Sequence, residues 1–214
     1  GLHAGDMKYL DLDGNNKIEQ TVSANDIKDQ RIIGNSLPRY TYSIRLNAEW
    51  NGIDFSVFFQ GVGKQDWYPS SDAFAFWGPY SSPAPSFIPK DFLADVWSVD
   101  NPDAYFPRPR GYIAWTDGRS LSSVNNRYLQ SLAYCRLKNL TVGYTLPVKW
   151  LSKIHVQKAR LYFSGENLLT LDRLDTDYID PEAAAAGTNW KTGKTNALSY
   201  PFSKTYSFGI DITF

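Results

Sequence analysis

Residues 204–214 read KTYSFGIDITF, and this stretch decides the fold. Apolar residues occupy every second position from Tyr206 to Phe214, with polar residues or glycine between them. Because successive side chains of a β-strand point to opposite faces of its sheet, the pattern predicts a strand with one apolar and one polar face. Alternation alone does not say which face meets water, so the rest of the sequence has to decide that.

Four other segments alternate in the same way, and the sequence therefore predicts an all-β fold. The two segments nearest the N-terminus are joined by Asn51-Gly52, a strong hairpin signal. Farther along, Leu137 is out of phase with the apolar series that starts at Leu140, which predicts a β-bulge near Lys138 and Asn139. The expected strands are residues 39–50, 52–61, 130–146, 157–168 and 203–214.

The composition excludes several classes of function. Among the 214 residues, 22 basic and 22 acidic side chains cancel, so no long-range field would attract nucleic acid or an anionic membrane surface. No apolar run approaches the roughly 18 residues of a transmembrane helix, and Cys135 alone cannot form an internal disulfide. Aromatic residues make up 15% of the chain, a share common in carbohydrate binders and outer-membrane barrels. The sequence begins with Gly1 rather than Met, which we interpret as a fragment or a processed chain.

The connections between the expected strands alternate between short and long. Short turns join the first strand to the second and the third to the fourth, whereas residues 62–129 and 169–202 form long connections. Connections in compact soluble domains mostly run about 4–6 residues. With this alternation, all long connections leave the same end of the sheet, as the extracellular loops of outer-membrane barrels do. A five-stranded soluble sheet is the alternative.

Seven stretches of the chain together resemble one family. They are GDMKYLDLDGNNKIE, DQRIIGNSLPRYTYSIRLNAEWNGIDFSVFFQGVG, NPDAYFPR, YLQSLAYCRLKNLTVGYTLP, ARLYFSGENLLTL, YIDPEAAAAG and YPFSKTYSFGIDITF. In this order, and over nearly the whole chain, they are similar to the C-terminal part of the SusC/RagA-family TonB-dependent transporters, the outer-membrane importers of Bacteroidetes.

The resemblance implies a fold and a function. In that family a transmembrane barrel of roughly 22 antiparallel strands encloses an N-terminal plug. This chain would supply the last strands and the extracellular loops 1–37, 62–129 and 169–202, and it would lack the plug and the segment that contacts TonB. The resemblance further implies nutrient import through the outer membrane of a Gram-negative bacterium, with a SusD-like surface lipoprotein as partner. The implied cargo is an oligosaccharide or a peptide, with the oligosaccharide favoured. The alternative function is a soluble, secreted, β-rich carbohydrate-binding module.

The stretch DLDGNNKIE is spaced like the beginning of an EF-hand calcium loop, whose ligands stand at alternate positions. Asn16 replaces the usual glycine, but Asn tolerates the left-handed conformation. Val22 stands where the twelfth position needs a carboxylate, which leaves Asp26 or Asp29 as a late ligand. A solvated turn rich in Asp and Asn has the same composition, so Ca²⁺ is a candidate cofactor and no other is indicated. The alternating donors are Asp11, Asp13, Asn15, Lys17 (through its carbonyl) and Glu19.

The two long loops supply the candidate ligand-binding residues. Aromatic faces in the loop 62–129 can stack on sugar rings, or they can form a small core of the loop itself or pack against a partner protein. In the loop 169–202, Asp175 and Asp177 are candidates for binding sugar hydroxyls. Paired carboxylates would also suit glycoside hydrolysis, but no scaffold strand fixes their spacing, so we expect no enzyme. The candidate stacking residues are Trp67, Trp77, Tyr80, Trp97 and Trp115.

The resemblance also gives a meaning to the stretch 204–214. An apolar series that ends on Phe214 resembles the signal read by the barrel-assembly machinery of outer membranes. In that orientation the apolar face meets lipid, and Thr205, Ser207 and Asp211 face the lumen. The residues of the expected assembly signal are Phe214, Ile212, Ile210, Phe208 and Tyr206.

Overall fold

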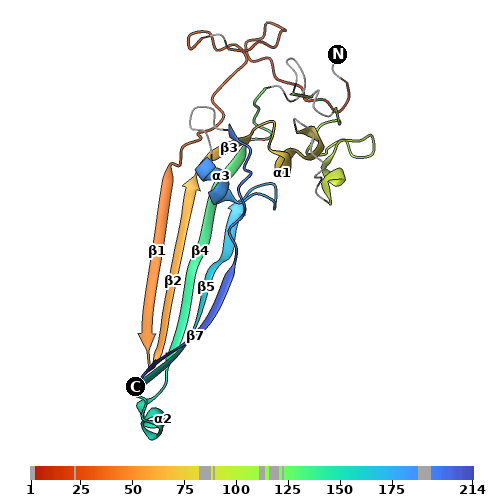
Figure 1. Ribbon diagram of the computed structural model, residues 1–214. Coiled ribbons are helices and arrows are strands. Elements are labelled where there is room, and N and C mark those ends of the chain that lie inside the picture. Colours follow the sequence, from red (N-terminus) through yellow and green to blue (C-terminus); the bar gives the residue numbers. More distant parts are fainter. Residues whose placement is uncertain are drawn as a thin grey trace.

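The computed structural model describes residues 3–21, 23–81, 88, 90–110, 114–115, 121, 123–187 and 194–214, without the side chains of residues 154 and 194. The chain forms one open, mainly antiparallel sheet with a layer of loops at one end (Figure 1). The all-β prediction is confirmed. Among the described residues, no helix is both long and apolar enough to cross a membrane.

Five long strands form the sheet, and each pairs antiparallel with the next. All five expected strands are found, but β2 continues three residues past the expected end at 61, to Lys64, and β5 continues past 168, to Arg173. Residues 62–64 and 169–173 therefore belong to strands, although the sequence analysis assigned them to loops. In order across the sheet, the strands are β1 (Tyr40–Trp50), β2 (Ile53–Lys64), β4 (Gln130–Thr145), β5 (Lys158–Arg173) and β7 (Thr205–Thr213).

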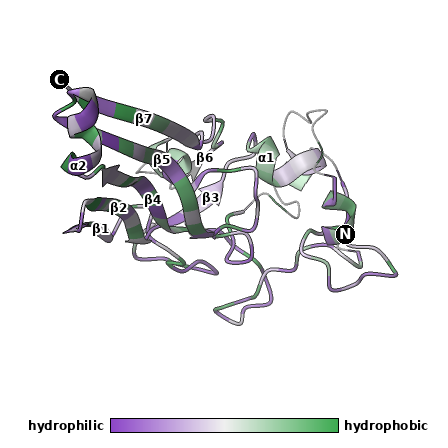
Figure 2. Cartoon of the chain, turned by 90° about the horizontal axis from the view of Figure 1, so that it is seen from below, coloured by the Kyte–Doolittle hydropathy of each residue, from purple (hydrophilic) through white to green (hydrophobic). Residues whose placement is uncertain are grey.

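One face of the sheet is apolar and uncovered. The pairing register lines up equivalent positions of the five strands, so apolar side chains form continuous rows across the sheet. Phe208 is 83% exposed and Trp50 76% exposed. The alternation is visible as bands of colour along β5 and β7 (Figure 2). One such row consists of Ala48, Phe55, Val142, Phe163 and Phe208.

The opposite face is polar. The Ser56 hydroxyl donates a hydrogen bond to Asn47 Oδ1 at 2.7 Å, and the hydroxyls of Thr141 and Ser164 lie 3.3 Å apart. The corresponding row consists of Asn47, Ser56, Thr141, Ser164 and Ser207.

The predicted irregularity in β4 is confirmed. In the pairing with β2, Phe58 lies opposite Asn139 and Phe59 opposite Leu137, so Lys138 is the extra residue of a β-bulge. The pairing with β5 shifts at the same place. The bulge places Leu137 on the apolar face, although Leu137 is out of phase with Leu140 in the sequence. One inserted residue reverses the alternation of side chains along a strand.

The short connections lie at the end of the sheet away from the loops (Figure 1). Asn51 and Gly52 both have positive φ, 49° and 85°, as a type I′ hairpin turn requires, which confirms the hairpin. Between β4 and β5, the chain forms the one-turn helix α2 (Val148–Leu151) and the 3₁₀ turn η4 (Ser152–Ile154).

The loops at the other end contain several short helices and strands. The loop after β2 contains β3 (Asp66–Pro69), α1 (Phe74–Trp77), η1 (Gly78–Tyr80) and η2 (Phe92–Asp95). The loop after β5 contains α3 (Pro181–Gly187) and β6 (Lys194–Thr195), and β6 pairs parallel with β3. The largest fully buried side chains of the described residues lie in this layer and in the adjoining end of β4.

Candidate functional site

The loop after β2 folds around an aromatic core. Trp77 lies at its centre, with its ring centroid 4.8 Å from that of Phe76, 4.9 Å from that of Trp115 and 5.0 Å from that of Tyr128, all three edge-on. Trp67 and Trp77 are 0% exposed and Tyr80 is 1% exposed. The expectation that these three residues offer stacking faces to a sugar is therefore wrong for this conformation. Their rings stabilise the loop layer instead.

Trp97 and Trp115 remain as half-exposed candidates. The Trp115 indole N–H donates to the Tyr80 carbonyl at 2.6 Å, which fixes the ring at the margin of the core. Trp97 packs against Gly5, whose positive φ of 84° and missing side chain both suit the contact, because a Cβ there would lie 2.3 Å from the indole ring. The N-terminal segment thus covers part of the Trp97 ring.

Asp175 and Asp177 differ in their surroundings. Asp175 Oδ2 accepts hydrogen bonds from the Tyr105 hydroxyl at 3.0 Å and from Gln130 Nε2 at 3.2 Å. Burial, followed by the Asp175 charge, raises the pKa of Tyr105, so the phenol stays protonated and keeps donating. Asp175 therefore joins the two long loops to β4, while Asp177 is exposed.

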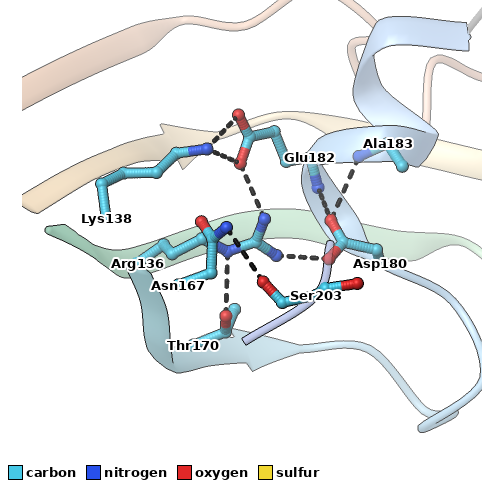
Figure 3. A network of polar contacts seen from close by, with 8 residues as sticks. All are labelled: Arg136, Lys138, Asn167, Thr170, Asp180, Glu182, Ala183 and Ser203. Atoms are coloured by element: carbon cyan, nitrogen blue, oxygen red, sulfur yellow. Dashed lines mark hydrogen bonds and ion pairs between the residues drawn. The ribbon is translucent and has the colours of Figure 1, made fainter. Parts of the chain in front are cut away.

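A buried ionic network holds the loop after β5 against the polar face of the sheet (Figure 3). The Arg136 guanidinium, with its side chain 2% exposed, donates to Asp180 at 2.5 Å, to Glu182 at 2.8 Å and to Thr170 at 2.9 Å. Lys138, the bulged residue, also binds Glu182 at 2.8 Å. Because a buried charge is stable only when it is paired, Arg136 and helix α3 are held together.

Helix α3 begins within the same network. Asp180 Oδ1 accepts hydrogen bonds from the backbone N–H groups of Glu182 and Ala183, while its Oδ2 accepts from Arg136. Asp180 thus caps the helix and pairs with the strand at once. The Phe202 ring covers the other side, 5.0 Å from Arg136 Cζ and 4.6 Å from Lys138 Nζ.

The sequence analysis did not identify this network. The available signal was the face of Arg136 on β4, which it shares with Leu132 and Tyr134, both buried. A charged side chain between buried neighbours needs an opposite charge nearby, and the acidic loop supplies it.

The Asp/Asn-rich stretch folds into a compact turn. Asn16 has a positive φ of 63°, as expected for its position. Asp11 accepts hydrogen bonds from the backbone N–H groups of Gly14 and Asn16 at 2.6 and 2.7 Å. Asn15 Nδ2 donates to Asp13 and to Glu19, at 3.0 Å each. The turn is therefore ordered by its own side chains.

Asp29, rather than Asp26, completes the acidic group. Carboxylate oxygens of Asp11, Asp13 and Asp29 lie within 4.8 Å of one another, the only such group of His, Cys, Asp and Glu among the described residues. Asp26 instead pairs with Lys28 at 3.4 Å. Backbone N–H groups of Glu19 and Leu12 hold the pKa of Asp29 below its ordinary value. Oxygens at this spacing are compatible with one Ca²⁺, whose ligands lie at about 2.3–2.6 Å.

Comparison with known proteins places the chain among outer-membrane receptors. No family model matches the sequence. The chain is 32% identical over 216 residues to TonB-dependent receptor P3 of Formosa agariphila, and 27% identical over 213 residues to TonB-dependent receptor P26 of the same organism. Each match covers 98% of this chain but only 19–20% of the relative, so the chain spans about a fifth of their length.

The fold agrees with that relationship. The chain superimposes on structures of the RagAB peptide transporter with a TM-score of 0.58, and on the RagAB peptide importer in its open-open state with 0.57, at 23% sequence identity. These matches cover 92% of this chain and 19% of the solved one. The resemblance noted from the sequence is confirmed. Over nearly its whole length the chain is a relative of the TonB-dependent receptors P3 and P26, and its fold is that of the matching part of the RagAB structures.

Proposed function

We propose that the chain is part of a TonB-dependent importer that carries nutrients through the outer membrane of a Gram-negative bacterium. The observation that carries this function is the uncovered apolar face of the five-stranded sheet, in a chain whose relatives are TonB-dependent receptors. Exposed aromatic and aliphatic rows of this extent suit contact with lipid. TonB would act through parts of the full-length protein that lie outside this chain.

The alternative, a secreted carbohydrate-binding module, requires water on both faces of the sheet. Side chains such as Phe208 and Trp50 would then lie in solvent at 83% and 76% exposure. Expressing this chain alone without detergent separates the two functions. We expect aggregation, and a cooperatively folding, monodisperse product would support the secreted module.

The loop layer is the proposed extracellular end of the molecule, and the end with α2 is the periplasmic one (Figure 1). A groove of about 720 Å³ opens in the loop layer between residues 9–33 and residues 124–126. Ile32 is 96% exposed at this groove, and Leu10 is 72% exposed. We propose this groove as a contact surface for a SusD-like lipoprotein. The name RagAB, given to the structures of similar fold, denotes two components.

The cargo is proposed to be an oligosaccharide, with a peptide as the second candidate. RagAB is described as a peptide importer, whereas half-exposed Trp97 and Trp115 with exposed Asp177 suit sugar rings and hydroxyls. Uptake of labelled oligosaccharides and peptides by a deletion strain, complemented with the full-length gene, identifies the class. Unchanged uptake of both classes on deletion would contradict nutrient import through this protein.

The proposed cargo residues are tested within the same assay. Trp97→Ala and Asp177→Asn should raise the cargo concentration needed for half-maximal uptake, whereas Tyr200→Ala, at 89% exposure, serves as the matched control. If all three variants need the same cargo concentration for half-maximal uptake, Trp97 and Asp177 do not bind the cargo.

Two further roles are proposed for segments outside the cargo surface. The turn with Asp11, Asp13 and Asp29 is proposed to bind Ca²⁺, with the Asn15 side chain, the Lys17 carbonyl and Glu19 as additional donors. The alternating apolar residues of β7 and Phe214, which is 81% exposed, are proposed as a signal for the barrel-assembly machinery. Deleting Phe214 should lower the amount assembled in the outer membrane while leaving transport per molecule unchanged.

A further inference from the structure

The helix α2 lies at the end of the sheet opposite the loop layer, the proposed periplasmic end (Figure 1), and it carries the exposed Trp150. It starts directly after Pro147, and Leu151 fixes it to the sheet with an exposure of 4%. Val148 and Trp150 on the same short helix are 68% and 64% exposed. Among the described residues, no aromatic ring packs against Trp150, so the indole is held outward by a well-anchored turn rather than by an aromatic partner.

The charged residues of the turn that carries this tryptophan are all basic. Lys149 and Lys153 are both exposed, and residues 146–157 contain no Asp or Glu. The other short turn differs, because Glu49 and Asp54 flank its Asn51-Gly52 corner. The whole chain has a net charge of zero, but the turn between β4 and β5 is basic and contains a tryptophan.

The position of the turn indicates what it contacts. The apolar face of the sheet continues to the strand ends beside α2, where Tyr144, Leu161 and Ile212 are exposed. Tryptophan prefers the boundary between lipid tails and water, and lysine extends its ammonium group to the headgroups. Basic groups close to a membrane attract anionic headgroups.

We propose that α2 with Lys149, Trp150 and Lys153 binds the headgroup of an anionic phospholipid, such as phosphatidylglycerol, in the periplasmic leaflet of the outer membrane. Trp150 and Val148 enter the boundary region, and the two ammonium groups pair with the phosphate. The binding site requires the orientation proposed above, with α2 on the periplasmic side.

The test uses the full-length transporter, purified in detergent with equal amounts of phosphatidylglycerol and phosphatidylcholine of identical acyl chains. Native mass spectrometry counts the lipids that stay bound. We expect phosphatidylglycerol to be retained in preference, and Lys149→Gln with Lys153→Gln to weaken that preference by about fivefold for each lysine. The matched control, Lys8→Gln with Lys90→Gln, removes the same charge from exposed positions in the loop layer and should keep it.

Two results would overturn the lipid site: no preference for phosphatidylglycerol in the parent protein, or equal losses in the two double variants. Trp150→Phe supplies a second measurement, since it should remove part of the fluorescence that brominated phosphatidylglycerol quenches. Quenching that is the same in the parent and in Trp150→Phe also contradicts the site. The proposed function fails in a different way: the parent protein would then not assemble into the outer membrane.

Discussion

Arg160 of β5 binds Asp54 of β2 across the strand that lies between them. Its Nε and Nη2 donate to the two carboxylate oxygens at 2.8 and 2.6 Å, over Gly143 of β4. A Cβ at Gly143 would lie 2.4 Å from Asp54 Oδ1 and 2.6 Å from Arg160 Nε. The missing side chain thus lets one ion pair connect three strands on the polar face, and Arg160 also reaches Asp211 of β7 at 3.1 Å.

We therefore expect Gly143→Val to separate this pair and to destabilise the barrel by about 1–3 kcal/mol, the usual cost of adding a side chain to a filled space. The change is measured as a lower temperature at which the full-length protein loses its folded mobility on gels. Gly63→Ala is the control, because a Cβ there would lie 3.3 Å from Tyr40 Cβ, a tight contact that involves no ion pair. Equal melting temperatures for both variants would show that the Asp54–Arg160 pair does not depend on Gly143.

Arg136 supplies a second prediction, about the loop that carries α3. Arg136→Met leaves Asp180 and Glu182 without their buried partner, at 8% and 21% side-chain exposure. Breaking a buried pair in this way costs about 3–5 kcal/mol. We expect residues 174–187 to exchange their amide hydrogens much faster while β1 and β2 remain protected. The exposed Arg173→Met should leave exchange unchanged, and protection of α3 that survives in Arg136→Met would contradict the role of the network.

The calcium turn gives a third prediction. Adding Ca²⁺ should raise the melting temperature of the full-length protein, and Asp11→Ala with Asp13→Ala should abolish that rise. Asp26→Asn is the control, since Asp26 pairs with Lys28 and lies outside the acidic group. No rise in the parent protein would exclude Ca²⁺ from this turn.

The aromatic core of the loop layer should open in alkali. Burial raises the pKa of Tyr128 from 10.0 to about 12, and burial also raises the pKa values of Tyr68, Tyr80 and Tyr105. A phenol with a raised folded pKa contributes stability that is fully present below pH 10 and is lost as the pH rises toward 12. Limited proteolysis of the loop 62–129 should therefore accelerate between these values. Cleavage at a constant rate over that range would contradict the burial of the phenols.

The sequence was sufficient for the strands because alternation is a local signal. It predicted five strands, the hairpin at Asn51-Gly52 and the bulge at Lys138, each from residues close together in the chain. It did not predict the packing of the loops, since the burial of Trp67, Trp77 and Tyr80 depends on contacts with residues far along the chain, such as Tyr128. Arg136 was missed for the same reason, because its partners Asp180 and Glu182 follow more than forty positions later.

The most direct test of the central claim compares the two faces of β7 in outer-membrane vesicles. Single cysteines are placed at positions 206 to 212 in a full-length protein carrying Cys135→Ser, and their reaction with a membrane-impermeant thiol reagent is measured. Cysteines replacing Phe208, Ile210 or Ile212 should react slowly and contact a lipid-soluble quencher. Those replacing Ser207 or Asp211 should react readily from water. Equal or reversed reactivity of the two series would contradict a lipid-facing apolar face and, with it, the transmembrane barrel.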